Sequence, residues 1–344
     1  MIANGNLFPM VIMVIGHEKH EVERKVVSIL RILSESRDPL GARVIAARLS
    51  NYGVDLGERA VRYHLKIMDE RGLTELMGRD GRLLTKAGND EMRSALISDK
   101  VGFVINKIEL LAFQTTLDLD THSGQVPTNV SIFPKSQFRK ACNAMSGAFK
   151  AGICVSDLVA TANEGEKLAG LTVPEGSVGF ATVCSIIMNG ALLKAGIPMD
   201  SKFGGLLQIR RQKPLRFVEL IEYAGSSLDP SEIFITSRMT SVREVIAEGH
   251  GNVLANFREI PAPCKATAEK VIEGLKMAGL GGLLMMGETS QSVCEIPVGV
   301  NKLGIILAGG LNPVAAALEA GIAVKNTAMS GVIDYQELTS FWQL

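Results

Sequence analysis

Apolar residues recur at helical spacing in three short segments near the start of the chain. The first covers residues 21–36 and ends before Pro39, because proline cannot continue the hydrogen-bond ladder of a helix. The second covers residues 42–49 and the third residues 58–70. Three short helices joined by tight turns predict a helix-turn-helix, which we place within residues 20–86.

The third predicted helix separates an apolar face from a cationic face. Val61, Leu65 and Met68 fall on one side and are expected to pack on the first two helices. The other side carries three basic residues and one aromatic in a single stripe: Arg59, Arg62, Tyr63 and Lys66. Such a stripe on the second helix of this motif fits the major groove of DNA, whereas the alternative is an ordinary solvated face.

Two short extended runs follow the third helix and predict a β-hairpin. Residues 73–77 and 83–85 flank a turn that contains Asp80-Gly81, a pair typical of tight hairpins. A hairpin directly after a recognition helix is a wing. We expect Arg79 and Arg82 at its tip to reach DNA phosphates or the minor groove.

The segments on either side of this domain are predicted to lie outside its compact fold. Residues 1–19 are expected to form an extension without fixed structure, and residues 87–100 a linker helix. The apolar run in the extension is interrupted by Pro9, is too short to span a bilayer and lacks the basic start of a signal peptide. No membrane role is expected.

Residues 101–340 repeat their own pattern. Leu193-Lys-Ala-Gly-Ile197 recurs as Leu318-Glu-Ala-Gly-Ile322, and Val173-Pro-Glu-Gly176 recurs as Ile296-Pro-Val-Gly299. Each copy reads as strand, loop, helix, strand and a Gly/Pro turn into another helix. Two copies predict a two-lobed α/β domain with internal duplication.

We place the two lobes at residues 101–212 and 213–340, with a small-molecule site in the groove between them. The expected fold is therefore an N-terminal winged helix-turn-helix, mainly α with a β-wing, plus this larger two-lobed α/β domain. The larger domain is also the expected site of dimerisation.

Polar residues that interrupt apolar runs of the larger domain are the candidate contacts for an effector. Cys184 lies within the apolar run 180–187, and Asn189, which we match with Asn312, precedes a helical segment. Asn312 stands before a proline at the start of a helix, where free N–H groups can bind an anion. Arg258 is a candidate clamp for a carboxylate. Plain helix capping and a surface salt bridge are the alternative interpretations.

Composition restricts the classes of function. The chain has 344 residues, 47% of them hydrophobic, which suits two or three compact domains. Its 36 basic residues equal its 36 acidic ones, so affinity for nucleic acid must come from local placement of charge. Five cysteines without a CxxC pair fit a reducing cytoplasm and argue against a zinc site. Common catalytic and phosphate-binding motifs are absent from the sequence, so we predict no enzyme, metal or cofactor.

Several stretches resemble one known family. Residues 41–49, 57–66 and 72–75 resemble the winged helix of the archaeal nitrogen regulatory repressor family, NrpR. Stretches of the larger part resemble that family's nitrogen regulatory domain: residues 193–198, 203–207, 257–261, 297–299 and 309–313. The resemblance covers about residues 20–335.

This resemblance implies a repressor of nitrogen-assimilation and nitrogen-fixation genes. It implies a homodimer on a palindromic operator of double-stranded DNA, released by the effector 2-oxoglutarate. Some family members carry two regulatory domains, whereas this chain has room for one. It is similar to the form that works with a second regulatory-domain protein lacking a winged helix. Two alternatives stay open: a winged-helix regulator of another metabolite, and an enzyme with a winged-helix docking module.

Overall fold

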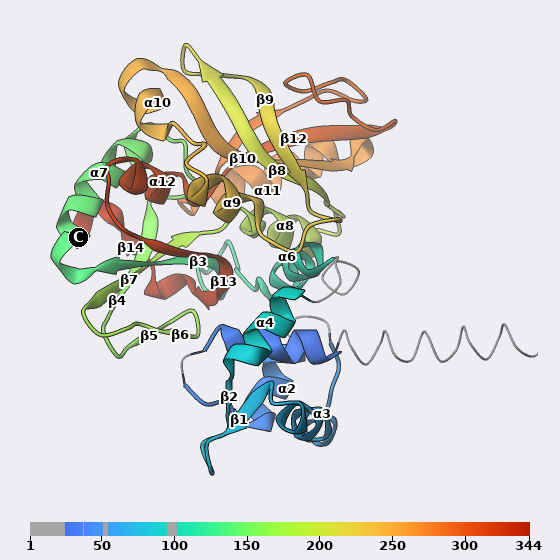
Figure 1. Cartoon of the computed structure of the whole chain (residues 1–344). Coiled ribbons are helices and arrows are strands. Elements are labelled where there is room, and N and C mark those ends of the chain that lie inside the picture. Colours follow the sequence, from blue (N-terminus) through green and yellow to red (C-terminus); the bar gives the residue numbers. More distant parts are fainter. Residues whose placement is uncertain (1–24, 37, 51–53, 95–101) are drawn as a thin grey trace, which may run out of the picture. The chain divides into compact units, whose positions relative to one another are not determined.

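The computed structural model describes residues 25–36, 38–50, 54–94 and 102–344 (Figure 1). The chain divides into two compact units, residues 1–107 and 108–344, which are described separately. The predicted N-terminal extension lies outside the described residues. Among the helices in the described ranges, none has the length and apolar character needed to cross a membrane.

The first unit is a winged helix-turn-helix built around a small apolar core. Residues 25–34 are helical, and α2 (Ala42–Ser50) and α3 (Glu58–Glu70) follow. The inner face of α3 is the one that its periodicity predicts, with three completely buried side chains: Val61, Leu65 and Met68.

The wing follows α3 directly. β1 (Thr74–Leu76) and β2 (Arg82–Leu84) pair antiparallel, and α4 (Lys86–Ser94) comes next. Leu40 extends this ribbon, because its N–H and C=O exchange hydrogen bonds of 3.0 Å with Arg82. The wing turn reaches Arg82 through Gly81, where φ is +122° and a Cβ would lie 2.3 Å from the carbonyl carbon of Leu40. Only glycine fits there.

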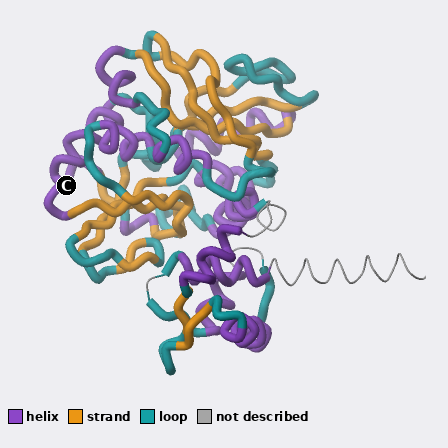
Figure 2. Tube along the Cα trace, viewed as in Figure 1, coloured by secondary structure: helices purple, strands orange, loops and turns teal. Residues whose placement is uncertain are grey.

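The second unit contains two five-stranded antiparallel sheets (Figure 2). One has the order β13-β3-β7-β4-β14, made of Lys325–Asp334, Gln125–Pro134, Ser177–Val183, Leu158–Asn163 and Thr339–Ser340. The other has the order β11-β12-β10-β8-β9, made of Leu283–Met286, Lys302–Ala308, His250–Pro261, Asp200–Arg210 and Lys213–Glu222. A separate ribbon pairs β5 (Lys167–Leu168) with β6 (Leu171–Thr172).

Helices pack on and between these two sheets (Figures 1 and 2). They are α6 (Phe103–Gln114), whose first residues belong to the first unit, then α7 (Phe138–Lys150), α8 (Ile186–Lys194), α9 (Pro230–Thr236), α10 (Val242–Glu248), α11 (Lys265–Met277) and α12 (Asn312–Glu319). An apolar core cluster joins both sheets through α8 and α11.

The internal duplication is evident in the order of elements. The first copy runs β3-α7-β4-β7-α8-β8, and the second runs β10-α11-β11-β12-α12-β13. The last strand of each copy pairs with the first strand of the other, since β8 lies beside β10 and β13 beside β3. The helices are exchanged in the same way, because α12 packs on α7 and α8 on α11.

This exchange corrects the predicted division of the larger domain into lobes 101–212 and 213–340. β8 belongs to the second sheet, and the chain returns through β13 and β14 to complete the first. The lobes are therefore interleaved in sequence.

Candidate functional site

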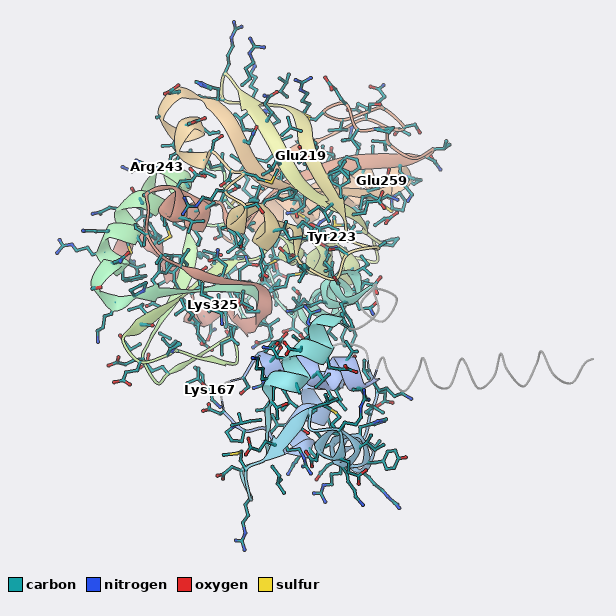
Figure 3. The ribbon with its side chains drawn as sticks, in the orientation of Figure 1. Lys167, Glu219, Tyr223, Arg243, Glu259 and Lys325 are labelled. Atoms are coloured by element: carbon teal, nitrogen blue, oxygen red, sulfur yellow. The ribbon has the colours of Figure 1, made fainter. Side chains whose placement is uncertain are left out.

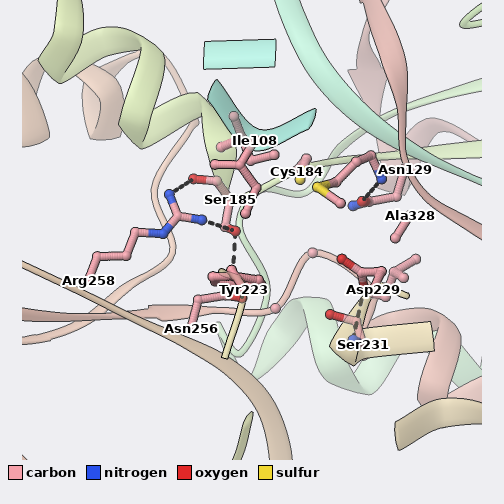
Figure 4. A pocket seen from close by; sticks show the side chains of 15 residues that line it. Ile108, Asn129, Cys184, Ser185, Tyr223, Asp229, Ser231, Asn256, Arg258 and Ala328 are labelled. Carbon is pink, nitrogen blue, oxygen red and sulfur yellow. Dashed lines mark hydrogen bonds between the residues drawn. The ribbon is translucent and has the colours of Figure 1, made fainter. Parts of the chain in front are cut away.

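A pocket lies where the two sheets of the second unit meet the first turns of α8 and α12 (Figure 4). Asn129 of β3 and Asn256 of β10 both line it, so each copy of the duplication contributes its first strand. The other polar residues of the lining are Cys184, Ser185, Tyr223, Asp229, Ser231 and Arg258. The pocket has a volume of about 20 Å³, which is room for about one water molecule. A larger ligand requires its walls to separate.

Arg258 is the dominant feature of this pocket. It projects from β10, and only 1% of its surface is exposed. Nη2 donates to Oγ of Ser185 at 3.0 Å, and Nη1 lies 3.3 Å from the carbonyl oxygen of Ser185 and 3.7 Å from Sδ of Met199. Nε has no partner among the described residues, and no carboxylate in the described ranges forms an ion pair with the guanidinium.

The electrostatics of Arg258 are therefore unbalanced. Burial lowers the pKa of its guanidinium from the ordinary value, but arginine remains protonated in proteins. A buried charge costs several kcal/mol (about 3–5 when its partner is missing) unless an opposite charge meets it. Neutral acceptors alone hold this one. The arrangement is suited to an anion that enters the pocket and bonds to Nε and Nη2.

A hydrogen-bonded chain prepares the hydroxyl of Ser185 as a donor. The Tyr223 hydroxyl donates to Oδ1 of Asn256, and Nδ2 of Asn256 donates to Oγ of Ser185 at 3.0 Å (Figure 4). Because Ser185 Oγ accepts from both Asn256 and Arg258, its own proton is available to a ligand. Burial raises the pKa of the Tyr223 phenol, which keeps it a donor.

The opposite wall carries β3 of the first copy and the turn before α12, and it is built differently. Oδ1 of Asn129 accepts from the backbone N–H of Met329 at 3.0 Å. A Cβ on Gly310 would lie 2.7 Å from Nδ2 of Asn129 and 2.4 Å from the carbonyl oxygen of Val183. Glycine at 310 therefore lets the start of α12 approach β3 closely. The buried arginine of the pocket, Arg258, comes from the second copy alone, so the site is asymmetric.

The exposed face of α3 carries the predicted DNA contacts. Its cationic stripe is fully on the solvent side: Arg59, Arg62, Tyr63 and Lys66. Tyr63 is 65% exposed. Arg62 forms an ion pair with Glu58 one turn earlier. Arg79 lies in the exposed turn between β1 and β2. These side chains offer positive charge and one aromatic ring to a polyanion.

Arg82 differs from the prediction, because it lies at the start of β2 and not at the wing tip. Its Nε donates to both carboxylate oxygens of Asp69, at 2.8 and 3.1 Å, and the Thr74 hydroxyl donates to the same carboxylate at 2.6 Å. Asp69 lies in the last turn of α3. Arg82 therefore fastens the wing to the recognition helix through its Nε.

Comparisons with known proteins agree with both units. A family model described as NrpR regulatory domains NRD1 and 2 matches residues 101–340, and one described as the ribonuclease R winged-helix domain matches residues 27–92. The global nitrogen regulator NrpRI of Methanosarcina mazei is 43% identical over 318 residues, covering 92% of this chain and 98% of that protein. The chain belongs to the NrpR family.

Other NrpR relatives are longer. The global nitrogen regulators NrpR of Methanococcus maripaludis and Methanocaldococcus jannaschii are 33% and 31% identical over 91% and 92% of this chain. The chain spans about half of their length, 54% and 55%. A solved nitrogen repressor-like protein from Methanococcus jannaschii aligns with a TM-score of 0.59 and 27% identity, covering 69% of this chain and 98% of that one.

Two of the four predicted effector residues line the pocket of this NrpR-family regulatory domain, and two do not. Cys184 and Arg258 are in the lining. Asn312 is committed elsewhere, since its amide bonds to the backbone of Leu254 and Ile153 in three hydrogen bonds of 2.7 to 2.9 Å. It is a structural residue, which corrects the prediction.

Asn189 is also outside the lining, and it does not correspond to Asn312. It is the fourth residue of α8, whereas Asn312 is the first of α12. Nδ2 of Asn189 donates to Oγ of Ser201 at 3.0 Å, and its Oδ1 is buried without a partner in the described ranges.

Sequence reasoning missed five polar residues of the pocket: Asn129, Tyr223, Asp229, Ser231 and Asn256. A signal was present for two of them. Asn129 and Asn256 each stand five residues before the proline that ends their strand, Pro134 or Pro261.

Proposed function

We propose that this NrpR-family regulator represses nitrogen-assimilation and nitrogen-fixation genes, and that 2-oxoglutarate releases it from its operator. The winged helix binds a palindromic operator as part of a homodimer. The regulatory domain binds the effector. One observation carries the effector half of the proposal: a completely buried arginine, Arg258, faces a pocket and has no acidic partner in the described ranges.

In this proposal one carboxylate of 2-oxoglutarate bonds to Nε and Nη2 of Arg258 and to the hydroxyl of Ser185. The side-chain amides of Asn129 and Asn256 bond to the remaining oxygens of the effector. Charge-assisted bonds of this kind are the strong ones inside a protein. The polar groups of the pocket match those of the effector, but the pocket volume of about 20 Å³ is smaller than the volume of the effector.

Binding must therefore be coupled to a movement of the pocket walls. Asn129 lies on one sheet and Arg258 on the other, so a ligand that separates them changes the relation between the two lobes of the regulatory domain. A coupling free energy of about 1–3 kcal/mol would lower DNA affinity about 5- to 150-fold. The effector achieves this only if it prefers the opened state.

On the DNA side, the proposal rests on the exposed stripe of α3 and on Arg79 in the wing turn. The chain has no net charge, so a single winged helix binds DNA modestly and useful specificity needs two. A two-fold dimer would place two recognition helices in major grooves about one helical turn apart. Because this chain spans about half of the longer NrpR relatives, a second regulatory-domain protein is a further proposed partner.

A titration of operator DNA followed by fluorescence anisotropy tests this function. DNA from a nitrogen-assimilation promoter is titrated with the full chain at fixed salt, with and without millimolar 2-oxoglutarate. The expected result is tight binding that weakens at least fivefold with the effector and is unchanged by succinate or glutamate. Equal affinity in all conditions would refute effector release. A response to glutamate instead would identify a regulator of another metabolite.

A further inference from the structure

β9 forms an unusually apolar open edge of the second sheet. It is the last strand of this sheet. It pairs with β8 on one side, and no strand of the second unit pairs with its other side (Figure 1). Three of its large apolar side chains are exposed, Leu215, Val218 and Leu220, at 37–46%. Open apolar edges of this length are normally covered in a native protein.

The charges of β9 are separated along its length. Its first half carries Lys213 and Arg216, and its second half carries Glu219 and Glu222, all of them exposed (Figure 3 labels Glu219). The tight turn that precedes the strand adds further positive charge with Arg211. Within the described ranges no ion pair neutralises the four charges on the strand. One end of the edge is basic and the other acidic, with the exposed apolar residues between.

Such an edge is complementary to itself in one orientation. When a second β9 lies alongside in the antiparallel sense, the basic half of each strand faces the acidic half of the other. The exposed leucines of both then meet in the middle. A parallel arrangement would place like charges together, which is unfavourable. An antiparallel contact of identical strands has two-fold symmetry and closes as a dimer.

A groove at the acidic end supports this arrangement. It has a volume of about 380 Å³ and is lined by Ile221, Glu222, Gly225, Ser226, Ser227, Leu228 and Ile233. Leu228 is 57% exposed. In an antiparallel pair the basic turn of one copy lies beside this end of the other, so the groove would receive a turn of opposite charge.

We propose that β9 and the turn before it form the homodimer surface of this protein, by antiparallel contact with β9 of a second copy. The occupant is thus a second copy of this chain. Two register shifts in the β8–β9 pairing and Pro214 interrupt the ladder. Side-chain charge and apolar contact therefore supply most of the recognition. This inference rests on the proposed function in one respect, because that function requires a dimer for operator binding.

Charge reversal tests the surface. One variant combines Lys213→Glu with Arg216→Glu, and another combines Glu219→Lys with Glu222→Lys. Each gives the four charges on β9 one sign, so we expect both to be monomers at concentrations where the native chain is a dimer by analytical ultracentrifugation. Mixing the two variants restores opposite charges and should give a heterodimer. A chain with all four substitutions should dimerise again.

The matched control reverses an exposed arginine and lysine elsewhere in the same unit, Arg139→Glu with Lys140→Glu on α7, and should stay dimeric. Circular dichroism verifies that every variant is folded. Reversal variants that remain dimers, or mixtures that do not associate, would overturn the β9 surface. So would a native chain that is monomeric. Binding of 2-oxoglutarate to the monomeric variants is measured in parallel, and its loss would count against the effector proposal instead.

Discussion

Replacing Arg258 with Met is the most informative single substitution in the regulatory domain. Methionine is unbranched and fills the same slender space on β10 without a charge. The native guanidinium is buried, and its hydrogen bonds go to Ser185 and not to a carboxylate. The substitution therefore removes the charged group proposed to bind the effector, and it leaves no buried carboxylate without a partner.

The size of the effect follows from these contacts. Breaking a buried charge pair by removing one partner costs about 3–5 kcal/mol, so the affinity for 2-oxoglutarate should fall about 100- to 4,000-fold. At an effector concentration 100 times the native Kd, the native chain gains about 2.7 kcal/mol of stability. The variant, at the lower limit of the loss, gains about 0.4 kcal/mol. Without effector the variant should be as stable as the native chain or more stable.

Differential scanning fluorimetry measures both quantities in one experiment. Melting temperatures are recorded with and without 2-oxoglutarate for the native chain and for Arg258→Met. The matched control is Arg243→Met, which alters an exposed arginine on α10 (Figure 3). The control should keep the full upward shift, and Arg258→Met should show almost none.

Two outcomes would refute the reasoning about Arg258. A native-sized thermal shift in Arg258→Met would show that the effector binds elsewhere. A large loss of stability without effector, with binding intact, would show that the arginine is structural and that its neutral acceptors satisfy it.

Three further predictions concern the winged helix. Arg62→Ala should weaken operator binding by about 1–3 kcal/mol in anisotropy titrations and leave the effector isotherm unchanged; loss of both would make Arg62 structural. Arg82→Ala should lower the free energy of unfolding by about 1 kcal/mol in urea titration, because it removes the arginine partner of a half-buried Asp69. An unchanged free energy of unfolding would contradict the role of Arg82 in fastening the wing to α3. His64 is 7% exposed and its pKa is lowered, first by burial and then by Lys25. The folded unit favours the neutral imidazole, so stability should be complete above the unfolded pKa of 6.5 and fall as pH drops below it; a His64→Gln variant with the same pH slope would contradict this.

Local periodicity was sufficient to predict the winged helix. The spacing of Val61, Leu65 and Met68 identified the buried face of α3, and all three are completely buried. A short helix and its packing are encoded within a few turns of sequence, where period and capping residues are visible. Arg82 could not be interpreted in the same way, because its partner Asp69 lies on another element and is reached only once the wing has folded.

The larger domain could be predicted from its sequence only in part. Its duplication was visible in the repeated Ala-Gly-Ile motif and in a repeated proline and glycine separated by one residue, but the exchange of β8 and β13 was not. That exchange depends on pairing between strands far apart in the chain, and no local pattern reports it. The same holds for Asn312, whose three hydrogen bonds go to Leu254 and Ile153, and for the pocket itself, which forms only where both copies meet.

The central claim is that effector binding and operator binding oppose one another through the regulatory domain. Isothermal titration calorimetry of 2-oxoglutarate into the full chain, alone and saturated with operator DNA, tests it most directly. The account predicts one site per chain and an effector affinity that operator DNA weakens by the same factor by which effector weakens DNA binding, since such coupling is reciprocal. Identical isotherms with and without operator, or no heat of binding at millimolar effector, would contradict it.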